Sequence, residues 1–101
     1  MAKKSSIEKN NRRKRMALQH LQKRKALKAT IQNPKTSDAD RRAAQVALEK
    51  LPRNSSPNRV RNRCEMTGRS RAFTRAFGVS RLALRELALE GKIPGLRKAS
   101  W

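Results

Sequence analysis

The feature that most constrains this chain is its positive charge. Its 101 residues include 27 Lys and Arg against 7 Asp and Glu, which gives a formal net charge of +20 at pH 7. A compact form at this charge repels itself strongly, so the chain favours association with a polyanion. Apolar residues make up 36% of the sequence and aromatic residues 3%, so there is little material for a hydrophobic core. We therefore expect at most one small domain with extensions.

Several classes of protein find no support in the sequence. The single cysteine cannot form an internal disulfide, and no apolar run approaches the roughly 20 residues that span a bilayer. The N-terminal residues are basic but lack the apolar core of a secretory signal. We therefore expect a soluble intracellular protein.

The N-terminal third carries much of the charge. Residues 1–33 hold eleven Lys or Arg and one acid. The segment 12–31 is rich in helix formers without Gly or Pro, which predicts one long helix. Because cations share the side of its apolar residues, this helix has no dry packing face. We expect it to lie against nucleic acid, with a solvated or disordered tail as the alternative. Its expected RNA contacts are Arg12, Arg13, Lys14, Arg15, Arg24 and Lys28.

A second helix is predicted after Pro34, because proline cannot continue the first helix and restricts the residue before it. Thr36 and Ser37 are both placed to cap it, and apolar residues recur at three- and four-residue spacing as far as Leu51. This helix is nearly neutral, so we expect it to pack against protein rather than RNA. Pro52 ends it, and residues 53–60 indicate an extended linker without regular structure.

The only cysteine opens a spacing that small zinc ribbons and knuckles use for their ligands. Two residues separate Cys64 from Thr67, twelve more precede Ser80, and another two precede Ala83. Only Cys64 can bind zinc as a thiolate, so we predict a zinc-ribbon or knuckle-like module without zinc. In it Cys64 is a small buried residue, and Gly68 provides the positive φ of a tight reversal.

The rest of the module is predicted to be a short helical turn, a helix and a tail. Phe73 and Phe77 are four residues apart and can share one face of a helical turn. We expect them to form a small core together with Leu82 and Leu87. Ser80 is placed to cap a helix over residues 81 to about 90 that ends at Gly91, and an irregular tail follows. Trp101 either stacks on RNA or packs back on the module.

Catalysis lacks the residues that it needs. The only histidine, His20, is far in sequence from Cys64, and the seven acids are scattered. No nucleophile with a base and no glycine-rich phosphate loop is present. We therefore expect no enzymatic activity, no cofactor, no metal and no small-molecule substrate.

Nucleic-acid binding is the function that the basic residues favour. From residue 53 to 85 the basic residues are arginines, whose planar fork binds phosphate bidentately. Arg81 and Arg85 would repel each other in solution but suit a phosphate backbone. Charge alone does not separate RNA from DNA, so an architectural DNA-binding protein is the alternative, and a zinc-dependent module a third.

Particular strings also resemble a known family. Arg61-Asn62-Arg63-Cys64, Thr67-Gly68-Arg69, Phe77-Gly78, Arg85-Glu86-Leu87 and above all the ending GKIPGLRKASW are similar to bacterial-type small-subunit ribosomal protein S fourteen. That family has a short form with four zinc-binding cysteines and a long zinc-free form with an N-terminal helical extension. The length and the series at Cys64, Thr67, Ser80 and Ala83 resemble the long form.

This resemblance implies a structural protein of the small-subunit head that binds the 3′ major domain of the rRNA. It also implies support of subunit assembly and of the decoding region, contact with ribosomal proteins S three, S ten and S nineteen, and no membrane. The ribosome would be cytoplasmic or organellar. The implied RNA contacts of the module are Arg61, Arg63, Arg69, Arg71, Arg75, Arg81, Lys98 and Trp101, to which the charge of the last helix adds Arg85. The expected fold is mostly α and extended, with a basic helical extension (1–52), a linker (53–60) and a compact module with its tail (61–101).

Overall fold

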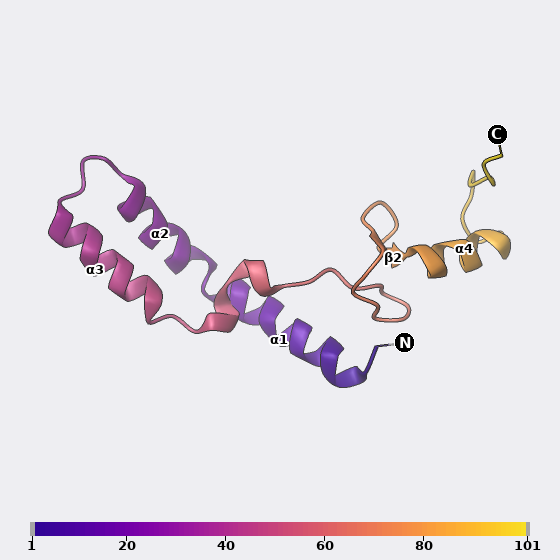
Figure 1. Ribbon diagram of the computed structural model, residues 1–101, viewed down its shortest axis with the longest axis horizontal. Coiled ribbons are helices and arrows are strands. Elements are labelled where there is room, and N and C mark those ends of the chain that lie inside the picture. The colour runs from indigo at the N-terminus through magenta and orange to yellow at the C-terminus, as the bar shows by residue number, and fades with distance from the viewer. Residues whose placement is uncertain (1, 101) are drawn as a thin grey trace. The chain divides into compact units, whose positions relative to one another are not determined.

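The computed structural model describes residues 2–100, and helices dominate its regular structure (Figure 1). Within this range lie α1 (Lys4–Gln19), α2 (Leu21–Gln32), α3 (Asp38–Glu49) and α4 (Arg81–Leu89), with the strands β1 (Phe73–Thr74) and β2 (Val79–Ser80). The prediction of a mostly α fold is therefore confirmed. The described residues divide into two compact units, one formed by 9–60 and the other by 2–8 with 61–100.

The predicted single helix over residues 12–31 is wrong. Helix α1 begins at Lys4, and the helical run breaks at His20, where φ is −98° and ψ is 3°. Backbone bonds still cross the break, since His20 N donates to Met16 O at 3.1 Å and Arg24 N donates to His20 O at 2.9 Å. No Gly or Pro marks this position, so the break is not encoded by local propensity. Helix α2 packs along α3, and we attribute its change of direction to this packing.

Helices α2 and α3 form a hairpin in which the two helices lie side by side (Figure 1). As predicted, α2 ends ahead of Pro34, with Asn33 in an extended conformation. Of the two predicted cap residues, Ser37 is confirmed as the cap of α3, because its Oγ accepts a hydrogen bond from Asp40 N at 3.3 Å. Ala44 is buried, so α3 packs against protein, and its partner here is α2 of the same chain.

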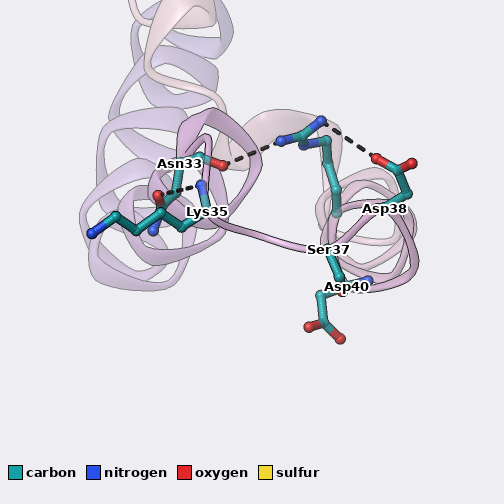
Figure 2. Close-up of polar contacts among 6 residues, drawn as sticks. Asn33, Lys35, Ser37, Asp38 and Asp40 are labelled. Carbon is teal, nitrogen blue, oxygen red and sulfur yellow. Dashed lines mark hydrogen bonds and ion pairs between the residues drawn. The ribbon is translucent and has the colours of Figure 1, made fainter.

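The loop of this hairpin is tied by side chains (Figure 2). Arg41 Nη2 donates to Asn33 O at 3.2 Å, while its Nη1 lies 3.7 Å from Asp38 Oδ1. Asn33 Oδ1 in turn accepts from Lys35 N at 3.0 Å. One arginine of α3 therefore joins the end of α2 to the start of α3.

The extended linker predicted for residues 53–60 is wrong, because this segment forms two short 3₁₀ turns, η1 (Arg53–Ser55) and η2 (Pro57–Arg59). Ser55 is 0% exposed, and its Oγ accepts from Arg24 of α2. The turn residues Asn, Ser and Pro suit such turns as well as an extended chain. A contact with α2 therefore selects the folded form, which the local sequence does not predict.

The second unit is organised around a tight turn at Cys64. Gly68 N donates to Cys64 O at 2.8 Å, and Cys64 N donates to Arg69 O at 2.9 Å. Gly68 has φ +76°, which confirms its predicted role in the reversal. The beginning of the chain packs here as well, since Ala2 N lies 3.4 Å from Thr67 O. Residues 2–8 therefore belong to the same unit as the turn.

Strands β1 and β2 form an antiparallel hairpin in place of the predicted helical turn. Phe73 pairs with Ser80 and Thr74 pairs with Val79. The two phenylalanines thus lie on a strand and in the connecting turn, and their four-residue spacing was a misleading indication of helix. Ala72, just before β1, has φ +58°, which is unusual for a residue other than glycine.

The core of this unit is smaller than predicted. Cys64, Val79 and Ala83 are buried, with Leu84 packed against them. The expected core of Phe73, Phe77, Leu82 and Leu87 is wrong, because Phe77 is 45% and Leu82 47% exposed. The turn, β2 and the start of α4 approach closely, so only small side chains fit between them. The predicted burial of Cys64 is confirmed.

Both ends of α4 follow the prediction. Ser80 Oγ accepts from Ala83 N at 3.3 Å and caps the first turn. At the other end Gly91 has φ +72°, and Lys92 N donates to Leu87 O while Gly91 N donates to Ala88 O. This pair of bonds is the Schellman motif that glycine favours after a helix.

In residues 2–100 no helix is long and apolar enough to cross a membrane.

Candidate RNA-binding surface

The turn, β2 and α4 bring the four positions of the zinc-ligand spacing together around the Cys64 thiol. Burial by itself raises the pKa of this thiol, but hydrogen bonds from the Thr67 hydroxyl and from the backbone of Ser80, Thr67 and Met66 outweigh it. Together they lower the pKa of Cys64 from 9.0 to about 6. Ala83 packs on the same cluster.

The side chains at these positions do not make a metal site. The Thr67 hydroxyl is engaged with the thiol, and the Ser80 hydroxyl caps α4. Structural zinc takes four ligands of the Cys, His or carboxylate kind, and residues 2–100 contain no group of three or more such side chains. What the arrangement supplies is a tight turn whose backbone and Thr67 hydroxyl form hydrogen bonds with Cys64.

Several arginines lie at this turn, and two of them donate to carbonyl groups at its end. Arg63 Nη1 donates to Gly68 O at 2.9 Å, and Arg61 Nε donates to Ser70 O at 3.2 Å. Arg63 and Arg69 are half-buried, and each has a buried Nε without a hydrogen-bond partner in the described protein. A fixed guanidinium loses less entropy when it forms an anion contact than a freely rotating one.

A second basic surface lies between α4 and the tail. Leucines of both segments line a cavity of about 370 Å³, with cations around it. This cavity brings the predicted contacts Arg81, Arg85 and Lys98 together, and it adds Arg97, which the sequence analysis missed. The adjacent basic pair at residues 97 and 98 was the available indication.

The other predicted contacts are placed as follows. Arg24 is engaged within the protein, because its Nε and Nη2 donate to Ser55 Oγ. Its expected contact with RNA stays a prediction, as do those of the rest of the set, and Trp101 lies outside the described residues. Most of the set is exposed, namely Arg12, Lys14, Arg15, Lys28, Arg61, Arg71, Arg75, Arg81, Arg85 and Lys98, whereas Arg13, Arg24, Arg63 and Arg69 are half-buried.

A family model and individual relatives both match this chain to one family of ribosomal proteins. The family described as "Ribosomal protein S14p/S29e" matches residues 47–100, which hold the turn, the hairpin and α4. The chain is 56% identical to "Small ribosomal subunit protein uS14" of Hyphomonas neptunium and 54% identical to the protein of the same name in Opitutus terrae. It is 55% identical to that of Methylorubrum populi. In each comparison the match covers 100% of both chains.

Proposed function

Because the chain belongs to the ribosomal protein S14p/S29e family, we propose that it is a structural component of the small-subunit head that binds the 3′ major domain of the rRNA. Membership makes it a ribosomal protein with a structural, rRNA-binding role rather than an enzyme. The domain of the rRNA, support of assembly and of the decoding region, and a cytoplasmic ribosome are parts of the proposal.

The observation that carries this proposal is the set of arginines fixed around the Cys64 turn. Two of them, Arg61 and Arg63, donate to backbone carbonyls, and these hydrogen bonds orient their guanidinium groups. Arg69 and Arg71 follow on the same stretch of chain. Guanidinium groups at fixed spacing suit the phosphates of a folded RNA, whereas loosely attached cations would bind any polyanion.

We further propose that the turn and hairpin correspond to a zinc knuckle whose metal is replaced by local contacts. The convergence of Cys64, Thr67, Ser80 and Ala83 supports this view. Under this proposal RNA binding completes the stabilisation of the unit, since a chain with net charge +20 gains from neutralisation. The proposed protein neighbours are ribosomal proteins S three, S ten and S nineteen.

A binding experiment with matched variants tests the proposal. The affinity of the purified chain is measured by filter binding for a transcript of the 3′ major domain, for another domain of the same rRNA and for duplex DNA. The exposed pair Arg71→Gln with Arg75→Gln removes two proposed contacts, and Arg42→Gln with Arg53→Gln removes equal charge elsewhere. We expect the first pair to weaken binding to the 3′ major domain by about tenfold or more.

The control pair is expected to lower affinity by less than about threefold, because it reduces only the overall positive charge of the chain. Binding should also weaken steeply with salt, with a log–log slope of roughly −0.7 to −0.9 for each neutralised phosphate. Equal effects of the two pairs, or equal affinity for duplex DNA, would contradict the proposal. Equal affinity for duplex DNA would support the architectural DNA-binding alternative.

A further inference from the structure

We infer that the cavity between the Cys64 turn and the first turn of α4 is a binding site for a single phosphodiester group of RNA. This inference rests on the proposed function and assigns part of it to one concave site. The cavity has a volume of about 410 Å³. The residues of its wall that carry the argument are Arg63, Thr67, Arg69, Arg71, Leu82 and Glu86.

The charge of the wall favours an anion. Three arginines, Arg63, Arg69 and Arg71, line the cavity together with one acid, Glu86. Arg63 uses Nη1 on Gly68 O, which fixes the plane of its guanidinium. A carbonyl neutralises no charge, so the cation remains available for a phosphate. The low-dielectric walls of a cavity concentrate the positive potential of these arginines inside it.

The wall also contains donors that the protein leaves unused. Arg63 Nε and Arg69 Nε are buried and have no hydrogen-bond partner within the described residues. A buried donor without a partner is unfavourable, because it has lost its hydrogen bond to water. The charges of these two guanidinium groups therefore lack full compensation within the described residues, and a phosphate in the cavity supplies it, because a phosphate has several acceptor oxygens and accepts bidentate Arg contacts.

The start of α4 adds to the preference for negative charge. Ser80, Leu82 and Ala83 from the first turn line the cavity, so the positive end of the nine-residue helix dipole faces it. Two of its amide groups are already used, since Arg81 N donates to Ala72 O and Ala83 N donates to Ser80 Oγ. The dipole is therefore a supporting contribution, and the arginines carry the site.

The shape and lining favour a backbone phosphate over a base. The wall in the described range contains no aromatic side chain, so a base would find no ring to stack on. The cavity is also much larger than a free phosphate ion, which leaves room for the flanking sugars. A net charge of +20 attracts a polyanion much more strongly than a monovalent ligand.

The test places a negative charge in the cavity without altering an arginine. Leu82→Glu does so at a position that is 47% exposed, in a first turn where the helix dipole favours an acid. Val46→Glu is the matched control, since Val46 is 48% exposed and lies on α3 in the other unit. We expect Leu82→Glu to weaken binding to the 3′ major domain transcript by at least tenfold, and Val46→Glu by less than threefold. Urea unfolding of both variants verifies that each is folded.

A second pair of variants reports on the arginine fork. Arg69→Gln is expected to lower affinity by about tenfold, and Arg69→Lys to recover only part of it, because Lys keeps the charge without the bidentate geometry. Full recovery by Lys would show that only general charge matters and would overturn the site. Equal losses from Leu82→Glu and Val46→Glu would overturn it as well.

A further experiment with inorganic phosphate distinguishes a site for free phosphate from a site for the RNA backbone. Sodium phosphate replaces sodium chloride at equal ionic strength, and the melting temperature of each folded variant is measured. If phosphate stabilises the parent chain but not Leu82→Glu, while RNA affinity is the same in both, the cavity holds free phosphate and the inference fails. If the parent chain does not prefer the rRNA transcript to duplex DNA, the proposed function fails instead.

Discussion

Arg24 of α2 holds Ser55 of η1 through two donors, since its Nε lies 3.1 Å and its Nη2 2.9 Å from Ser55 Oγ. The two residues are 31 positions apart in the chain. Ser55 Oγ also donates to Pro52 O, so one hydroxyl connects the end of the α3 segment to α2. This contact turns the stretch after α3 from a linker into a folded part of the helical unit.

Ser55→Ala is predicted to destabilise this unit by about 1–3 kcal/mol, because it removes two hydrogen bonds of the half-buried Arg24 guanidinium and leaves only the longer one from Nη2 to Pro52 O at 3.4 Å. Urea unfolding measures the loss, and amide hydrogen exchange of residues 53–59 should speed up. Ser56→Ala is the matched control, because only backbone atoms of Ser56 make the hydrogen bonds described in η2. Equal losses in the two variants would contradict the role given to Arg24.

Gly68→Ala is predicted to destabilise the second unit more than Gly91→Ala. Both glycines have positive φ, +76° and +72°, so both substitutions carry the backbone cost of about 1–2 kcal/mol. A Cβ at Gly68 would lie 2.6 Å from Ile7 Cδ1, whereas nothing lies within 4 Å of one at Gly91. Adding Ile7→Ala should recover part of the loss at Gly68, and an additive double variant would argue against the contact.

Ala72→Gly is predicted to leave stability unchanged or to raise it slightly. At φ +58° an alanine is strained, and glycine removes that strain while it adds entropy to the unfolded chain. Ala43→Gly, at an exposed position within α3, should instead cost about 1 kcal/mol. Unfolding midpoints of the two variants provide the comparison, and a similar loss in both would contradict the left-handed conformation at residue 72.

The Cys64 thiol is predicted to titrate near pH 6 rather than near pH 9, which the ultraviolet absorbance of the thiolate measures. Because the folded-state pKa is lowered, the thiolate stabilises the fold fully above pH 9, and this contribution is lost as pH falls through 6. The difference in unfolding free energy between the parent chain and Cys64→Ser should therefore grow from pH 6 to pH 9. A difference independent of pH would contradict the hydrogen bonds assigned to the thiol.

Local signals in the sequence predicted the ends of elements well. Ser37 and Ser80 each carry an oxygen that can reach the backbone three residues on, and Gly91, as a glycine, takes the left-handed conformation after a helix without strain. These effects need no knowledge of the rest of the fold. The spacing from Cys64 also picked out Thr67, Ser80 and Ala83, which lie close to the thiol in the structure.

The sequence does not predict features that depend on contacts between residues far apart in the chain. The break at His20 and the turns at residues 53–59 arise where α2 meets α3 and Ser55, which no local pattern announces. The core failed for a related reason, since the close approach of the turn to β2 selects Val79 and Ala83 over larger leucines. For the candidate RNA-binding surface, the sequence identifies the basic residues, but only the structure shows which of them line the same cavity.

The most direct test of the account is where the chain sediments in a lysate of its own cells. On a sucrose gradient the untagged chain, detected by mass spectrometry, should appear in the fractions of the small subunit and of whole ribosomes, and a high-salt wash should release it before proteins held by fewer ionic contacts. A chain that remains at the top of the gradient, or that travels with chromosomal DNA, would contradict the assignment to the small ribosomal subunit.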